Sequence, residues 1–206
     1  MRPPVLIPRP ETEELVELIL NDTQLEKERN VRFIDIGCGS GAILLAILKA
    51  RPCWSGIAID PVEKAVELCR ENARLLKVEK RCEVFQSSIE DWTYSRQRAL
   101  CDFVVSNPPY IPRNDLQSLE PEVILHEDYN ALYGGADGLD VVREVLARAP
   151  SLVKTKGNIW LEVDSSHPAE ISRLMENSSH HNKALCFEKA YHDFQGHERF
   201  CKISIR

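Results

Sequence analysis

The sequence predicts one α/β domain built on a seven-stranded, mostly parallel sheet that ends in an antiparallel hairpin. Two observations carry this prediction. Short β-rich runs alternate with apolar or amphipathic helical segments along most of the chain, as in a parallel sheet covered by helices on both faces. The last two β-rich runs have no helix between them, so they should form a hairpin with one antiparallel strand.

The individual elements follow from hydrophobic periodicity and from turn residues. Residues 1–30 are predicted to be an extended, proline-rich lead-in and a helix over about 11–26, and residues 31–206 to be the main domain. A turn near Gln195-Gly196 should join the last two strands. The predicted strands cover residues 31–36, 55–59, 82–85, 102–105, 158–163, 185–189 and 200–205. The predicted later helices cover residues 42–50, 62–76, 139–149 and 169–176.

Composition narrows the function before any motif is considered. The chain has 206 residues and is 43% hydrophobic, which suits one well-buried domain. Its net charge of −6 argues against nucleic acid as the main ligand, because such binding depends on Lys and Arg. No apolar run is long enough to span a membrane. The seven cysteines are scattered and lack a C-x-x-C spacing, so free thiols and no metal site are expected.

A glycine-rich turn follows the first predicted strand and opens the next helix. Gly37, Gly39 and Gly41 permit a tight turn and let a ligand approach the backbone without a Cβ clash. Cys38 lies within the turn, and Asp35 before it can accept a hydrogen bond from the turn or face a cofactor amine. Such a turn borders the methionine part of S-adenosylmethionine in methyltransferases. Taken alone, it also fits the looser dinucleotide fingerprint.

Further cofactor contacts are predicted after the second and third strands. Asp60 ends the second strand, where a carboxylate can accept hydrogen bonds from both hydroxyls of a ribose. Ser88 and Ile89 follow the third strand, where contacts to adenine are expected. Because the carboxyl ends of parallel strands form the binding edge of such sheets, these residues and the glycine turn should hold one cofactor.

Asn107, Pro108, Pro109 and Tyr110 stand directly after the buried strand 102–105. The nitrogen of an amide or an exocyclic amine is a poor nucleophile, so a site must accept its N–H hydrogens and aim it at an electrophile. The Asn107 side-chain oxygen and the Pro108 carbonyl can do so, while the two prolines stiffen the loop and Tyr110 stacks on the planar group. Catalysis would then be mostly positioning. This segment predicts an N-methyltransferase in which Asn107 also borders the cofactor.

The chain resembles the catalytic domain of the HemK/PrmC-type release-factor glutamine N5-methyltransferases, over essentially its whole length. The Asn-Pro-Pro-Tyr segment alone is shared with adenine N6-methyltransferases, whereas the combination of motifs is specific. The segments that carry the resemblance are residues 5–13, 35–41, 107–110, 131–139 and 193–199.

The resemblance implies a Rossmann-like, class I methyltransferase fold and S-adenosylmethionine as the cofactor, with S-adenosylhomocysteine as its product. The implied substrate is the glutamine of the Gly-Gly-Gln motif in peptide chain release factors, which act in translation termination. In this transfer Asn107 and Pro108 would bind the glutamine amide and Tyr110 would line its pocket. A monomer with no membrane association and no direct nucleic-acid binding is expected. The implied location is mitochondrial if the source is eukaryotic and cytoplasmic otherwise.

Two features depart from the family pattern. Members usually carry an amino-terminal helical domain that grips the release factor, and this chain starts at the lead-in. Relatives often read Glu-Pro where this chain has Glu127-Asp128, which bears on the geometry of the stretch 111–137. That stretch has little regular pattern, and a loop of such length is usually functional or disordered.

Three other functions stay open at this point. The first is methylation of adenine or of another protein side chain, against which the acidic charge weighs. The second is a cofactor-binding module without catalysis, which the intact Asn107, Tyr110 and Asp60 disfavour. A nicotinamide dehydrogenase is the most distant, because no acid–base residue stands beside the glycine turn.

Overall fold

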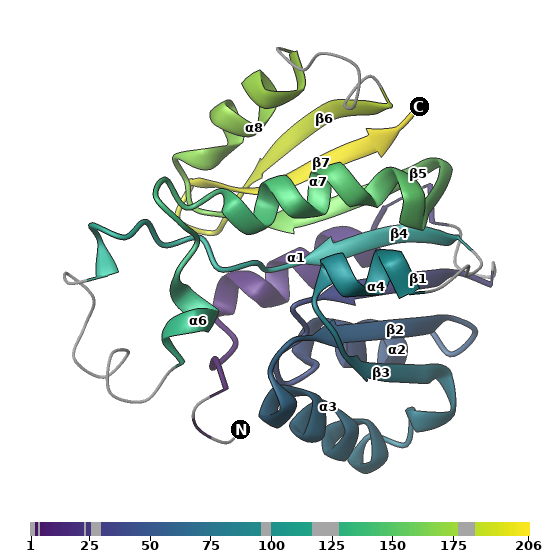
Figure 1. The fold of residues 1–206 in the computed structure, drawn as a ribbon. Coiled ribbons are helices and arrows are strands. Elements are labelled where there is room, and N and C mark those ends of the chain that lie inside the picture. Colours follow the sequence, from purple (N-terminus) through teal and green to yellow (C-terminus); the bar gives the residue numbers. More distant parts are fainter. Residues whose placement is uncertain are drawn as a thin grey trace.

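A computed structural model describes residues 3, 5–22, 24–25, 30–95, 100–116, 128–176 and 184–206, and it shows one sheet with helices on both faces (Figure 1). The strands are β1 (Arg32–Ile36), β2 (Ser55–Asp60), β3 (Cys82–Gln86), β4 (Cys101–Ser106), β5 (Val153–Glu162), β6 (Leu185–His192) and β7 (Glu198–Ile205). The helices are α1 (Pro10–Leu20), α2 (Ala42–Ala50), α3 (Glu63–Leu75), α4 (Ile89–Ser95), α6 (Tyr129–Leu132), α7 (Asp140–Leu152) and α8 (His167–Glu176), with a 3₁₀ turn η1 (Glu79–Arg81).

The seven strands are arranged in the order β3-β2-β1-β4-β5-β7-β6. The strands from β3 to β5 are parallel to one another, and β7 runs antiparallel to both β5 and β6. The predicted sheet, with its antiparallel terminal hairpin, is therefore confirmed. After β3 the chain crosses to the other side of β1, so β1 and β4 lie side by side at the switch point where such sheets bind ligands.

Each face of the sheet has its own hydrophobic core. Helices α1, α2 and α3 cover one face, where the rings of Phe33 and Phe103 stack at 4.8 Å and Trp54 meets Phe103 edge-on at 6.0 Å. Helices α4, α7 and α8 cover the other face over the aliphatic residues of the central strands. Alternate residues of a strand point to opposite faces, and both faces are buried, so these strands read as continuous apolar runs.

The turn between β6 and β7 lies where the sequence predicts it. Asp193 Oδ1 accepts the N–H groups of Gln195 and His197, each at 2.9 Å, and Gly196 adopts φ 85°. Asp193 Oδ2 also accepts from Arg199 Nε at 3.2 Å. A single buried carboxylate thus organises the whole turn.

The structure corrects two element boundaries. Helix α1 ends at Leu20, earlier than predicted, where the Asn21 N–H bonds to the Glu17 carbonyl and polar residues follow. Strand β5 begins at Val153 rather than near residue 158. Residues 154–156 are exposed and polar, and a register shift separates Val153 from the later part of the strand, so the sequence does not mark this start. The sequence pattern of a buried strand covers only its second half.

Helix α4 was not predicted, because seven residues are too few to show a clear apolar stripe. Its first turn is capped by Ser88, whose Oγ accepts the Asp91 N–H at 3.0 Å and donates to the Asp91 carboxylate at 2.8 Å. Trp92 then packs on Phe85 of β3, with ring centroids 4.9 Å apart. This arrangement is a side-chain cap followed by one buried anchor.

The two ends of the stretch 111–137 are tied together. Ile111 N–H donates to the Leu132 carbonyl at 2.9 Å, and the Gly134 N–H donates to the Ile111 carbonyl at 3.0 Å. Arg113 Nη donates to the Tyr133 hydroxyl at 3.1 Å. Glu127, the first residue of the Glu127-Asp128 pair that departs from the family pattern, lies outside the described residues.

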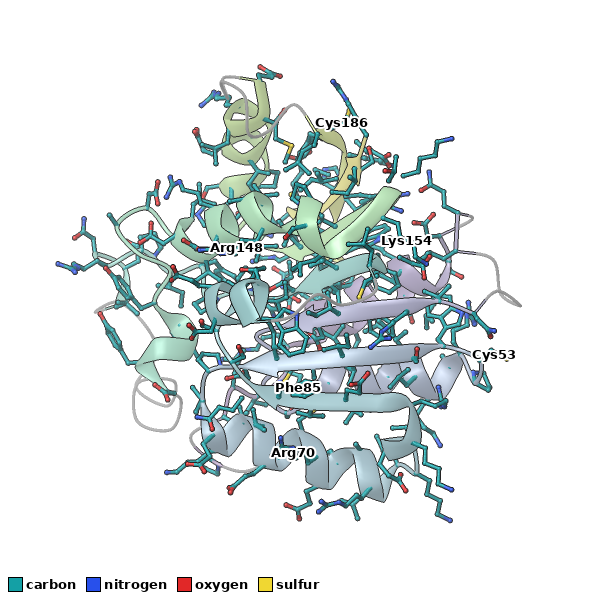
Figure 2. The ribbon with its side chains drawn as sticks, turned by 45° about the vertical axis from the view of Figure 1, so that its right-hand side comes forward. Cys53, Arg70, Phe85, Arg148, Lys154 and Cys186 are labelled. Atoms are coloured by element: carbon teal, nitrogen blue, oxygen red, sulfur yellow. The ribbon has the colours of Figure 1, made fainter. Side chains whose placement is uncertain are left out.

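All seven cysteines are free thiols, as predicted. Cys53 and Cys186, labelled in Figure 2, lie on separate parts of the molecule. Burial raises the pKa of Cys101 to about 11, so that sulfur stays protonated near neutral pH.

Candidate active site

The strand register places four predicted site residues and Glu162 in one row at the carboxyl edge of the sheet. Across the edge from β3 to β5, the row contains Ser88, Asp60, Gly37, Asn107 and Glu162. Each of them ends its strand or follows it within two residues. Groups at the ends of adjacent parallel strands can act on a single ligand.

Asp60 fixes the glycine turn against the end of β2. One carboxylate oxygen accepts the Gly39 N–H at 2.9 Å, and the other accepts the Val62 N–H at 2.9 Å. The Gly37 N–H donates to the Ile59 carbonyl at 2.9 Å. Burial raises the pKa of Asp60, although the hydrogen bonds from Val62 and Gly39 lower it. Each carboxylate oxygen keeps a further lone pair for a hydroxyl donor.

A cavity of about 280 Å³ lies along this row. Its wall is mostly apolar, with a few polar groups among which are Asp60, Ser88 and Asn107. The predicted contacts Gly37, Gly39 and Ile89 also line it. Apolar walls with a few well-placed polar groups are typical of small-molecule sites. The remaining lining residues are Val5, Leu6, Ile36, Ile59, Pro61, Val62, Ala65, Ser87, Pro108, Pro109, Asp128, Ala131, Val141 and Glu144.

Gly37 leaves room in the wall of this cavity. It has φ 72°, and a Cβ added there would have no protein atom within 4 Å. A side chain at this position would instead project into the cavity that Gly37 lines. The turn is therefore shaped to let a ligand lie directly against the backbone.

A second cavity, of about 140 Å³, adjoins the first. Asn107, Pro108 and Pro109 line both cavities, whereas Tyr110 lines only the smaller one. Its other lining residues are Leu6, Arg9, Ile111, Ala131 and Leu132. The Asn-Pro-Pro segment thus stands where the two spaces meet, so one can take a cofactor and the other a substrate group.

Asn107 is held by a hydrogen bond to helix α1. Its side-chain Nδ2 donates to the Thr12 hydroxyl at 3.3 Å, and Thr12 is itself buried. This bond engages the nitrogen end of the amide, which leaves its oxygen to accept a hydrogen bond. Burial raises the pKa of the neighbouring Tyr110 to about 12, so its hydroxyl stays neutral.

Three residues predicted to hold the cofactor do not line the cavity. Asp35 is fully buried and accepts the Leu44 N–H of α2 at 3.2 Å. Burial raises the pKa of Asp35 to about 7, against the opposing effect of the bond from Leu44. Cys38 is buried, and Gly41 packs inward, where an added Cβ would lie 2.6 Å from Cys69 Sγ. These three residues lie on the buried side of the turn, away from the cavity.

Sequence reasoning missed two side chains beside Asn107. Thr12 lies on α1, and its place under Asn107 has no local signal in the sequence. Glu162 ends β5 and is only 1% exposed. The strand-end argument that predicted Asp60 applies equally to Glu162, but no motif near Glu162 in the sequence marks a site.

Two features that would point to other functions are absent from the part of the chain that the structure describes. No group of His, Cys, Asp or Glu side chains there is arranged to hold a metal ion. No helix among the same residues is long and apolar enough to cross a membrane.

The match to a known family agrees with this geometry. Residues 16–135 fit the family described as methyltransferase small domain, and the chain belongs to that family. The turn, the strand-end carboxylate and the Asn-Pro-Pro-Tyr segment all fall within the matched residues.

The chain is also similar to proteins named for one particular reaction, which confirms the resemblance inferred from its motifs. It is 39% identical to the human "MTRF1L release factor glutamine methyltransferase" over 98% of its own length and 62% of the human protein. It is 42% identical to a release factor glutamine methyltransferase of Streptococcus pneumoniae, over 77% of its length and 54% of that protein. The chain therefore spans less than two thirds of the length of these relatives.

Solved structures of low sequence identity share the fold. TrmN from Thermus thermophilus superimposes with a TM-score of 0.64 at 18% identity, over 95% of this chain and 48% of TrmN. An O-methyltransferase family protein from Burkholderia thailandensis gives a TM-score of 0.59 at 16% identity, over 95% and 56% of the two chains. The chain thus has the class I methyltransferase fold.

Proposed function

We propose that this chain is the catalytic part of an S-adenosylmethionine-dependent methyltransferase that modifies the glutamine side chain in the Gly-Gly-Gln motif of a peptide chain release factor. One observation carries the proposal: Asn107 lies at the junction of the larger cavity and the smaller one. The names of the relatives support the choice of substrate.

The residues of the larger cavity fit this cofactor. Gly37 and Gly39 would lie against its amino-acid part, Asp60 would accept the ribose hydroxyls, and Ser88 and Ile89 would border the adenine. When bound, S-adenosylmethionine supplies an electrophilic methyl group on a sulfonium. Asp60 is pre-positioned for its role, because two backbone N–H groups already fix its carboxylate.

In the smaller cavity the chain would orient the substrate amide. The Asn107 oxygen accepts one N–H of the glutamine side chain, and the Pro108 carbonyl accepts the other. Tyr110 and the prolines line this cavity and would limit the amide to one plane. Fixing a poor nucleophile in this way supplies a large part of the rate enhancement, on the order of 7–11 kcal/mol in well-oriented systems.

The direct test uses a purified release factor and cofactor labelled on its methyl group. Label should appear on the wild-type factor and be absent from a variant whose motif reads Gly-Gly-Ala. Label that persists on the Gly-Gly-Ala variant would exclude this substrate. Transfer to oligonucleotides instead would favour an adenine methyltransferase, and calorimetry without cofactor binding would favour a non-catalytic module.

A pair of variants tests the division of roles. Asn107→Ala should bind the cofactor nearly normally and lose turnover by about 100-fold or more, since it removes a transition-state contact. Asp60→Ala should instead weaken cofactor binding by about 10-fold or more, since it removes charge-assisted hydrogen bonds. Calorimetry and steady-state kinetics separate the two effects. If both variants changed the same parameter, the assignment of the two cavities would be wrong.

Partner and location belong to the same proposal. The release factor is the proposed protein partner, and we propose that the chain acts on it as a monomer. In a eukaryotic source we propose a mitochondrial location, by analogy with organelle translation, and in other sources the cytoplasm.

A further inference from the structure

The orientation of the Asn107 amide decides whether this site can work. A carboxamide has an acceptor oxygen and a donor NH₂ group, and the two ends have nearly the same shape. Only the oxygen can accept an N–H from a substrate amide. If the contacts around Asn107 allowed its carboxamide to flip end for end, the NH₂ group would face the N–H groups of the substrate amide and repel them.

Thr12 alone does not determine this orientation. Its hydroxyl receives Asn107 Nδ2 at 3.3 Å, and the two residues are 95 positions apart in the sequence. A hydroxyl both donates and accepts, so it could equally bond to the amide oxygen of a reversed group. A second acceptor must therefore bind the hydroxyl hydrogen of Thr12, so that the Thr12 oxygen can only accept a hydrogen bond from Asn107.

Glu162 is the group in position to do so. Ser106 of β4 pairs with Leu161 of β5, so the next residues, Asn107 and Glu162, lie beside each other at the edge of the sheet. Glu162 is 1% exposed, and both of its carboxyl oxygens are buried without a hydrogen-bond partner of ordinary geometry. Thr12 and Asn107 are nonetheless close enough to lower its pKa. A buried polar group of this kind requires an explanation.

We propose that Thr12 and Glu162 are positioning residues that orient the Asn107 amide: Nδ2 donates to the Thr12 hydroxyl, the hydroxyl donates to the Glu162 carboxylate, and Oδ1 faces the substrate. This inference rests on the proposed function, because it assigns the acceptor that the substrate amide requires. An ionised carboxylate only accepts hydrogen bonds. The chain of bonds therefore has one direction as long as Glu162 is ionised.

The surroundings of Glu162 bring its pKa close to neutral pH. Burial raises its pKa to about 7, against the lowering effects of Thr12 and of Arg199 on β7. Glu11 on α1 raises it further, and Tyr110 also faces the carboxylate. Because the pKa is raised, Glu162 is protonated below about pH 7 and can then donate to Thr12. The hydrogen bonds from Asn107 to Thr12 and from Thr12 to Glu162 should therefore take this single direction as the pH rises through about 7.

Kinetics at saturating cofactor provide the first test. Glu162→Gln should lower kcat at about pH 8 by about 10-fold, the equivalent of one lost orienting hydrogen bond, and should abolish the rise in kcat between about pH 6 and 8. Its cofactor affinity should stay within about twofold of the wild type. The pKa of Asp35, which lies behind the glycine turn, is also raised to about 7. Saturating cofactor keeps any effect of Asp35 on cofactor affinity out of the measured kcat. An unchanged pH profile in Glu162→Gln would overturn the proposal.

Thr12 offers a matched pair that does not alter a buried charge. Thr12→Val keeps the shape and removes the hydroxyl, so it should lower kcat to a similar extent. Thr12→Ser keeps the hydroxyl and should retain most of the activity. Equal activities of the Val and Ser variants, or a loss confined to KM, would contradict the proposed chain of bonds.

A third measurement does not depend on activity. The side-chain NH₂ resonances of Asn107, assigned by their loss in Asn107→Ala, should shift with pH around 7 in the wild type and stay constant in Glu162→Gln. This result would support the orienting chain even if the release factor were not the substrate. Wild-type resonances that do not shift around pH 7 would overturn the inference and leave the proposed function intact.

Discussion

Gly37 and Gly41 belong to the same turn, but the absence of a side chain has a different consequence at each. Both have positive φ, at 72° and 81°. Gly37 faces the cavity, whereas a Cβ on Gly41 would meet Cys69 Sγ at 2.6 Å and Leu45 Cδ1 at 3.0 Å. Gly37 therefore makes room for a ligand, and Gly41 makes room for the packing of α2 on α3.

This difference gives a paired prediction. Gly41→Ala should lower the free energy of unfolding by about 2–4 kcal/mol, from backbone strain and overpacking. Gly37→Ala carries only the strain, about 1–2 kcal/mol, but should weaken cofactor binding by about 10-fold. Urea denaturation and calorimetry on both variants measure the two effects. Equal losses of stability would show that the two glycines do not differ as described.

Asp60 and Glu162 are both acidic residues at the ends of strands, but the sequence predicts a role for only one of them. Asp60 could be predicted because it follows a strand and a glycine turn stands nearby in sequence. Glu162 obeys the same rule but was missed, since nothing close to it in the sequence marks a site. Its importance comes from Asn107, 55 positions earlier, which only the pairing of β4 with β5 brings beside it.

At the scale of elements, helix α1 connects the core to the site. Leu15 and Ile19 are fully buried against the sheet, while Thr12, one turn earlier, reaches Asn107. Residues three and four apart share a face of a helix, so the packing of Leu15 also sets the position of Thr12. The lead-in before α1 contributes Val5 and Leu6 to the cavity wall.

Leu15→Ala tests this connection. Removing a fully buried leucine should lower the free energy of unfolding by about 2–5 kcal/mol. Glu17→Ala, on the exposed face of the same helix, should change it by no more than about 0.5 kcal/mol. Circular dichroism during urea denaturation measures both. A loss of less than about 1 kcal/mol in Leu15→Ala would mean that α1 is not anchored through this residue.

At the scale of the molecule, two buried acids affect stability in the same direction. The folded state raises the pKa of Asp35 from 3.8 and that of Glu162 from 4.5, each to about 7. As the pH rises, the unfolded chain loses these two protons first. Their contribution to stability is therefore full below about pH 4 and declines until about pH 7.

Neutralising either acid should consequently stabilise the protein at high pH. Asp35→Asn and Glu162→Gln should each raise the free energy of unfolding at about pH 8, on the order of 1–3 kcal/mol relative to the wild type. The gain should shrink towards zero near pH 4. Urea denaturation at several pH values measures it. A difference that did not vary with pH would show that these carboxyls are not protonated in the fold.

The sequence by itself determined the alternation of strands and helices, the hairpin turn, and the placement of Asp60 and Asn107 at strand ends. These features depend on periodicity and turn chemistry, which act between residues close in the chain. The tertiary structure decided what surrounds those residues: the cavity wall, the inward packing of Asp35 and Gly41, and the positions of Thr12 and Glu162 beside Asn107. Such contacts join distant segments, and their geometry exists only after the sheet and both helical layers have packed together.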